Sequence, residues 1–313
     1  MTEVPITDRR LQLAVLISTA VVAAEFVLLL AAVAFFRAMN ADIPDNLLAD
    51  LLPDPADPRL HGEALHARLA WMASVAFALF ASAVAIILAT TKILKELEPL
   101  RRRMLYVLAV LVLLAASVAS VSDVSLEVLR RPLLEPTLER YQVGSIAVTT
   151  TFAYIRRLVN ALFAAAAVAV VLALLTRSCL GPTMAATRGA ELSLKERFAD
   201  LHVLLIAAAA MLVSIVFTMA AWLAWPTAGL AKDSDGFHLV AEIARGVGIY
   251  WGTVFTLILV LAYLPCVGYL RHIAATSQDP AAAGAGGQEV KLLQDAVALL
   301  SPFISALLPV FLI

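Results

Sequence analysis

The stretch "LHVLLIAAAAMLVSIVFTMAAWLAW", residues 201–225, decides the fold class of this chain. It contains no Asp, Glu, Lys or Arg over its whole length. A helix that crosses the hydrocarbon layer needs about 20 mainly apolar residues, because each residue adds about 1.5 Å and every backbone polar group must be bonded within the segment. We therefore interpret residues 201–225 as a membrane-spanning helix.

Five further segments meet the same criterion. Together with the first they give six predicted spans, at residues 11–36, 69–91, 104–122, 158–176, 201–225 and 246–270. The composition agrees, since 62% of the residues are apolar and 15% are charged, against about 45 to 50% and about 25% in soluble domains. The sequence predicts an all-α, polytopic integral membrane bundle over residues 1–274, with the lipid bilayer as its surroundings.

The distribution of charge predicts the orientation of the spans. The short connection "TKILKELEPLRRR", residues 91–103, carries five basic residues, and such loops stay on the cytoplasmic side. We therefore expect the N-terminus and the region before the C-terminal tail to be cytoplasmic. The abundance of Ala, Leu and Arg is typical of a GC-rich bacterial source, which would place the protein in the inner membrane.

The outer connections are longer than the inner ones and have helical character. They contain "LLADLL", "SLEVLRR" and "FHLVAEIAR", and each leads without a break into the next predicted span. The second, fourth and sixth spans are therefore expected to project beyond the membrane. The predicted architecture is three long helical hairpins with outer helical extensions.

The C-terminal tail, "KLLQDAVALLSPFISALLPVFLI" at residues 291–313, follows a predicted flexible linker at residues 275–290. On a helix it presents one large apolar face and one stripe of small residues. The apolar face holds Leu293, Val297, Leu300, Ile304 and Leu308, and the stripe holds Gln294, Ala298, Ser301, Ser305 and Pro309. We expect Pro302 and Pro309 to break a plain seventh span. The tail is predicted to be a packed helix, docked within one subunit, packed between subunits, or lining a pore.

Glu25 is the one acidic residue inside a predicted span, deep in the bilayer. Counted along the helices, Asn160 and one of Arg156 or Arg157 lie within reach of its side chain. Because a carboxylate in the hydrocarbon layer is costly, this set of residues predicts either a polar clamp between two spans or a proton or cation site.

Close helix packing is predicted in the last span. Gly248 and Gly252 are four residues apart in "GVGIYWG" and would let another helix approach one face. Pro265 lies further along the same span, where its missing amide would free the Leu261 carbonyl and kink the helix.

No cofactor, metal or nucleic-acid partner is expected. His61 and His66 lack metalloprotease spacing, and Cys179 and Cys266 are too few and too far apart in sequence for a metal or disulfide framework. We expect both cysteines to be reduced and inert. The net charge of −1 does not suit binding to nucleic acid.

Three functions remain open after these exclusions, and none of them is enzymatic, because the spans carry no acid-base team. The first is an oligomeric channel or pore. The second is a scaffold or sensing subunit that binds a partner through its outer helices within a membrane complex. The third is a secondary transporter, against which stands the lack of paired broken helices at mid-membrane.

Overall fold

The computed structural model describes residues 6–39, 58–96, 129, 133, 146–180, 194–228, 230–276 and 288–312. Over these ranges the elements are α1 (Ile6–Met39), α2 (Pro58–Glu96), α6 (Ile146–Leu175), the π-helical turn η2 (Thr176–Leu180), α8 (Leu194–Thr227), α9 (Asp235–Thr276) and α10 (Gln288–Leu312). Five of the described helices are long and apolar enough to cross a membrane, and the described residues contain no strand. The predicted all-α membrane bundle is confirmed. The predicted span 104–122 lies outside the described residues.

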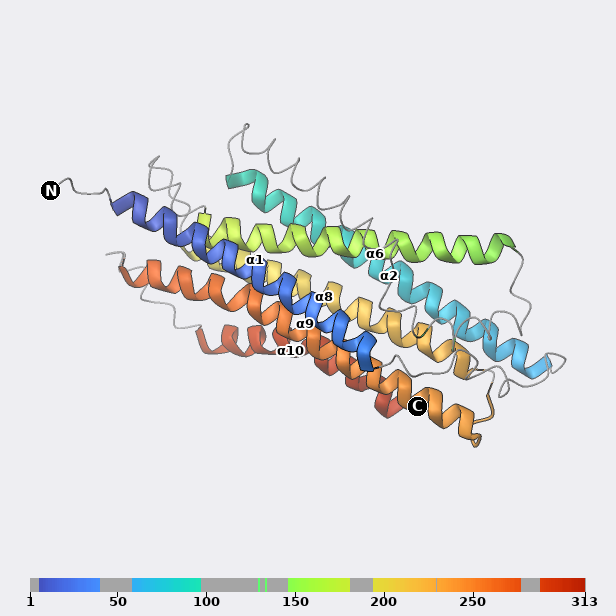
Figure 1. Ribbon diagram of the computed structural model, residues 1–313. Coiled ribbons are helices and arrows are strands. Elements are labelled where there is room, and N and C mark those ends of the chain that lie inside the picture. The colour runs from blue at the N-terminus through green and yellow to red at the C-terminus, as the bar shows by residue number, and fades with distance from the viewer. Residues whose placement is uncertain are drawn as a thin grey trace.

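The helices form an elongated bundle and run in two opposite directions along its long axis (Figure 1). Three of them, α1, α8 and α10, run one way, and α2, α6 and α9 return. Helix α8 lies at the centre and contacts α2, α9 and α10, while α6 packs on α2 and α1 packs mainly on α9. Among the described helices, α8 therefore has neighbours on several sides.

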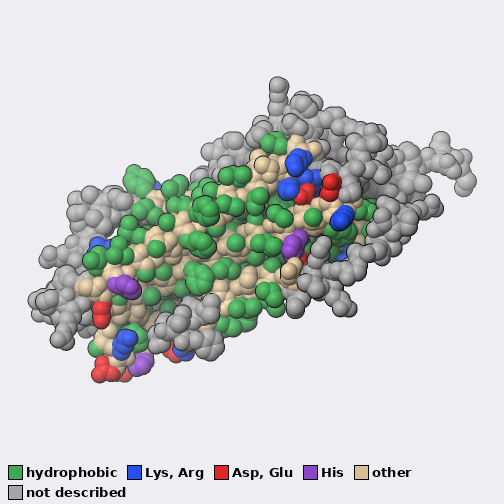
Figure 2. Space-filling view, turned by 180° about the vertical axis from the view of Figure 1, so that it is seen from behind, with side chains coloured by type: hydrophobic (Ala, Val, Ile, Leu, Met, Phe, Trp, Pro, Cys, Tyr) green, Lys and Arg blue, Asp and Glu red, His purple; other side chains and the backbone are tan. Residues whose placement is uncertain are grey.

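Matched residues at the two ends of the helices mark the thickness of the membrane. On three helices a basic residue follows an aromatic or basic one by 21 positions: Trp71 and Lys92 (92 − 71), Arg156 and Arg177 (177 − 156), and Tyr250 and Arg271 (271 − 250). Twenty-one helical residues span about 31 Å, close to the hydrocarbon thickness of about 30 Å. Figure 2 shows the same pattern, with charged side chains near both ends and an apolar band between them. We call these ends the Trp71 end and the Lys92 end.

Three helices begin well before their predicted spans at the Trp71 end. Helix α2 begins 11 residues before its predicted span (69 − 58), α6 begins 12 residues before (158 − 146), and α9 begins 11 residues before (246 − 235). None of the three is interrupted where it enters the predicted span. The predicted helical extension "FHLVAEIAR" is confirmed as part of α9, whereas "LLADLL" and nearly all of "SLEVLRR" lie outside the described residues.

Helix α8 is central because its sequence combines small and large apolar residues on most of its surface. Half of the residues in the most apolar stretch of α8 are buried, against 11% of those in the corresponding stretch of α1. Ala207, Ala208 and Ala209 are buried together, which lets neighbouring backbones approach closely. The Thr218 hydroxyl donates a hydrogen bond of 3.1 Å to the Ser74 carbonyl of α2. Polar contacts of this kind fix the register of helices whose apolar surfaces alone would leave it loose.

The tail is a continuous helix, α10, that packs against α8 and α9 of its own chain. The expectation that Pro302 and Pro309 would break it is wrong, because α10 extends past both residues. A proline at 302 leaves the Ala298 carbonyl without its usual backbone donor. The Ser301 hydroxyl donates to that carbonyl at 2.8 Å and so replaces the missing bond.

Candidate functional site at the Lys92 end

A network of buried charges joins three elements at the Lys92 end. Asp200 of α8 forms ion pairs with Lys92 of α2 and with Arg177 of η2, the latter at 2.8 Å. Arg197, also on α8, donates to the Arg177 carbonyl at 3.0 Å. Arg177 and Arg197 are almost fully buried. Because charges are costly in this setting unless they are paired, the network holds α2, η2 and α8 in one arrangement.

The π-helical turn explains why Arg177 reaches this network. A π-helical turn adds a residue to the helical repeat, so it rotates the side chains that follow it, and such turns are frequent at functional sites. Every residue from Thr176 to Cys179 is buried. The Thr176 and Ser178 hydroxyls donate to the carbonyls of Leu172 and Leu174 at 2.6 and 2.7 Å. These bonds satisfy backbone groups where the α-helical ladder changes.

A second polar cluster joins the tail to the bundle. Asp295 of α10 contacts His202 Nδ1 of α8 at 2.6 Å and accepts a hydrogen bond of 2.8 Å from the Tyr263 hydroxyl of α9. His202 lies two residues after Asp200 on α8, so the two clusters form one polar layer. Each carboxylate in this layer has two partners on two different elements. The layer therefore positions helices; among the described residues no group of His, Cys, Asp or Glu has the number of ligands needed to hold a metal ion.

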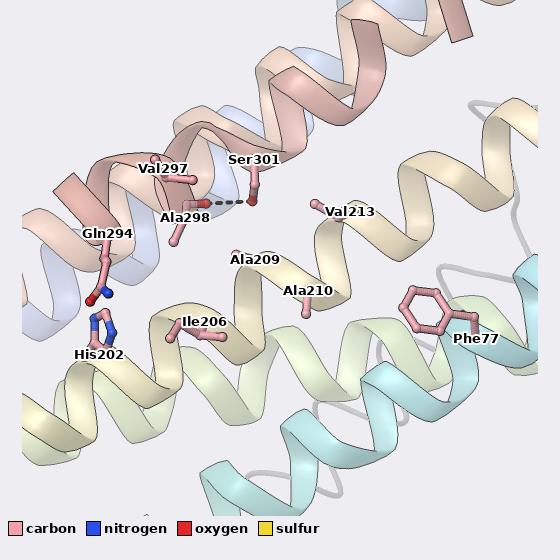
Figure 3. A pocket seen from close by; sticks show the side chains of 10 residues that line it. All are labelled: Phe77, His202, Ile206, Ala209, Ala210, Val213, Gln294, Val297, Ala298 and Ser301. Atoms are coloured by element: carbon pink, nitrogen blue, oxygen red, sulfur yellow. Dashed lines mark hydrogen bonds between the residues drawn. The ribbon is translucent and has the colours of Figure 1, made fainter. Parts of the chain in front are cut away.

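A groove of about 650 Å³ opens beside the second cluster, between α8 and α10. Phe77 of α2 closes the far end, and His202 and Gln294 lie side by side at the near end (Figure 3). The walls between them are apolar or small: Ile206, Ala209, Ala210, Val213, Val297, Ala298 and Ser301.

The residues of the predicted intramembrane polar cluster occupy two places. Arg156 and Asn160 line a small cavity of about 70 Å³ between α6, α2 and α8, at the Trp71 end. Arg157 is exposed. Glu25 lies on α1, and its Oε1 atom is buried with no hydrogen-bond partner among the described residues. The structure brings Arg156 and Asn160 together, and Glu25 forms no ion pair with either arginine.

The predicted packing residues of the last span lie against the tail. A Cβ atom at Gly252 would fall 2.6 Å from the Ala306 Cβ and 2.9 Å from the Pro302 carbonyl oxygen, and one at Gly248 would fall 3.6 Å from the Ala306 carbonyl oxygen. Pro265 lies inside α9, which continues past it to Thr276. The kink at Pro265 stays a prediction.

The small stripe and the large apolar face of the tail point in different directions. Ala298 and Ser305 are buried, Ser301 is half-buried, and Gln294 is exposed at the mouth of the groove. Among the described members of the large apolar face, Val297, Leu300 and Ile304 are about half exposed. Since the surroundings at this depth are lipid, the tail turns its large side chains outward and its small ones toward α8 and α9.

Cys179 and Cys266 are close in space although 87 residues (266 − 179) separate them in sequence. Both are free and fully buried, and they lie close enough between η2 and α9 for each thiol to influence the other. The expectation that they lie too far apart is wrong. Helix packing brings them together in a way that no local pattern indicates.

Burial of both thiols has a measurable consequence. We expect neither Cys179 nor Cys266 to react with a water-soluble maleimide in intact membranes, because neither side chain has exposed surface. Both should react fully in denaturing detergent. A Ser305→Cys variant is not a suitable control, since Ser305 is buried too, whereas Gln294→Cys at the exposed mouth of the groove should react. Labelling of the native chain before denaturation would contradict the packing of η2 on α9.

Sequence reasoning missed the residues that form the polar layer. The sequence patterns did not single out Asp200, His202, Asp295 or Tyr263. The partners of His202 and Lys92 lie 93 and 108 positions away. A usable signal exists nonetheless, because Lys92, Arg177 and Asp200 each lie within one residue of the end of a predicted span.

No known protein family model, no curated protein and no solved structure matches this chain.

Proposed function

We propose that this integral membrane protein is a non-enzymatic scaffold or sensing subunit that binds a partner through its projecting helices at the Trp71 end. The observation that carries the proposal is the continuity of α2 and α9 across the membrane boundary. From Pro58 to Trp71 and from Asp235 to Tyr250 they extend 13 and 15 residues (71 − 58 and 250 − 235). These lengths correspond to about 20 and 22 Å of helix outside the hydrocarbon layer.

The membrane boundary at this end is built to hold the projections rigidly. The Trp71 and Trp225 rings pack with centroids 6.3 Å apart, and the Arg68 guanidinium lies 6.0 Å from the Trp225 ring. Aromatic and basic side chains of this type anchor helices at the interface between lipid and water. A movement or load applied to the projecting ends would therefore be transmitted into the spans.

The projecting parts also expose apolar side chains. Leu65 on α2 and Leu239 on α9 are 48% and 41% exposed, at about 9 and 16 Å beyond Trp71 and Tyr250 by residue count. Single exposed leucines are common on soluble surfaces and do not by themselves indicate a binding site. We use Leu65 and Leu239 as positions for probes that would detect a bound partner.

The channel or pore favoured by the tail needs several copies of the chain. The described interior of one copy is packed with apolar side chains, and α10 docks on its own α8 and α9. A conducting path would therefore have to lie between subunits. A secondary transporter has less support, since α9 continues as a helix through Pro265 and paired helices broken at mid-membrane are typical of that class.

Site-specific photo-cross-linking in native membranes tests the scaffold proposal. We expect a benzophenone side chain at Leu65 and one at Leu239 to capture the same protein. Matched positions at membrane depth, Phe80 and Leu264, are also exposed and should capture lipid only. Replacing both leucines with Asp should abolish the cross-link to the partner from a third position, His66. Capture of the same proteins at all four positions would contradict the proposal, and conductance of the purified chain in planar bilayers would favour the pore instead.

A further inference from the structure

The groove between α8 and α10 lies at membrane depth, with its long axis across one leaflet. On α8 its lining extends from His202 to Val213, which is 11 residues (213 − 202) or about 16 Å of helix. One leaflet of the hydrocarbon layer is about 15 Å thick, half of about 30 Å. His202 lies 20 residues before Trp222 (222 − 202), so it is at the boundary of the membrane on the Lys92 side, and Val213 lies near the bilayer midplane, with Phe77 of α2 beyond it.

Two features of the groove restrict what can fill it. Its middle is lined by small or apolar side chains, among them Ala209, Ala210 and Ala298, which leave a hollow where a larger residue would pack. No water is present in the hydrocarbon layer to fill such a space. Its volume of about 650 Å³ is in the range of about 300 to 1,000 Å³ for sites that bind small molecules.

The mouth of the groove carries polar groups suited to a headgroup. Gln294 is exposed there, and its carboxamide has two N–H donors for phosphate oxygens. His202 Nδ1 contacts Asp295 at 2.6 Å, and the His202 side chain also lines the groove. Asp200, close by on α8, is already paired with Lys92 and Arg177. The polar mouth and the apolar channel therefore follow each other in the order found in a lipid molecule.

We propose that this groove is a binding site for one phospholipid of the leaflet at the Lys92 end. One acyl chain lies along α8 and α10 as far as Val213 and Phe77, and the phosphate-bearing headgroup lies beside Gln294 and His202. The bound chain fills the space that the small residues of α8 leave and so contributes to holding α10 on the bundle.

Photo-labelling in nanodiscs tests this site with a defined probe. The probe is a phosphatidylglycerol with a diazirine in one acyl chain, and labelled peptides are identified by mass spectrometry. We expect the wild-type chain to be labelled on α8 and α10 within the groove. Ala210→Phe places a ring in the hollow and should lower that labelling at least fivefold. Ala24→Phe, at an exposed position of α1, is the matched control and should leave it unchanged.

A second variant separates loss of the site from loss of the fold. Gln294 is exposed, so Gln294→Ala should leave the fold intact while weakening retention of the phospholipid about tenfold in native mass spectrometry, as expected for a lost hydrogen bond to a charged group. Equal labelling of the wild-type chain and Ala210→Phe would overturn the proposal. Cross-links from the groove to a second copy of the chain, in nanodiscs that hold two copies, would also overturn it, because the groove would then be a subunit interface.

Discussion

Replacing Gly252 with alanine is expected to displace the C-terminal helix from the bundle. The new Cβ would lie 2.6 Å from the Ala306 Cβ and 2.9 Å from the Pro302 carbonyl oxygen. The second contact is with backbone inside a helix, so it cannot be relieved by a side-chain rotation. Overpacking of this kind costs about 1 to 3 kcal/mol. The measurement is the thermal stability in detergent, together with the rate of proteolysis in the region between α9 and α10.

Gly268→Ala is the matched control for this prediction. Gly268 is on the same helix, and a Cβ there would meet nothing within 4 Å. Alanine is favoured over glycine inside a helix by about 0.5 to 1 kcal/mol, so this variant should be as stable as the wild type or slightly more stable. If Gly252→Ala behaved like Gly268→Ala, α10 would not be docked as the structure has it.

Replacing Asp200 with asparagine is expected to give the second large loss of stability. The change removes the carboxylate between Lys92 and Arg177 and leaves two cations close together without it. Breaking a buried ion pair by removing one partner costs about 3 to 5 kcal/mol. The measurement is the free energy of unfolding in detergent with a graded denaturant. Asp200→Asn/Lys92→Met should be more stable than Asp200→Asn alone, because the two positions are coupled.

An exposed ion pair provides the comparison. Glu242 and Arg245 on α9 are paired at 2.8 Å, with 65% and 38% of their side chains exposed. Exposed pairs contribute about 0 to 1 kcal/mol, so Glu242→Gln should change stability little. Similar losses for Asp200→Asn and Glu242→Gln would show that the network at the Lys92 end does not organise the bundle.

Local sequence was sufficient to predict the tail as a packed helix but not its conformation at the prolines. The pattern of small and large residues on α10 is readable from spacing alone, and the structure turns Ala298 and Ser305 inward. The predicted break at Pro302 was wrong because a side-chain donor, Ser301, bonds the carbonyl that the proline leaves free. That compensation depends on one rotamer and not on any period in the sequence.

The polar groups show where sequence reasoning stops. Glu25 was expected to reach Asn160 because residue counts along the two helices place them at similar depths, yet α1 packs mainly on α9, whereas Asn160 lines a cavity with α2 and α8. Depth in the membrane follows from counting residues along a helix. The identity of the neighbouring helix does not, and the same limit hid the ion pair of Lys92 with Asp200 and the contact of Cys179 with Cys266.

The sequence by itself determined that this is an all-helical membrane protein, where each of the five described spans lies, and that helices project from one end. These features are local, because a helix in lipid must satisfy its own backbone and needs a fixed length of apolar residues. Only the tertiary structure decided that α8 is central, that α10 docks beside it, and that Asp200, His202 and Asp295 form one layer. Apolar attraction has no direction, and spans rich in Ala, Leu and Val offer similar faces to one another. Which faces meet is therefore set by close packing and a few polar contacts across the whole bundle.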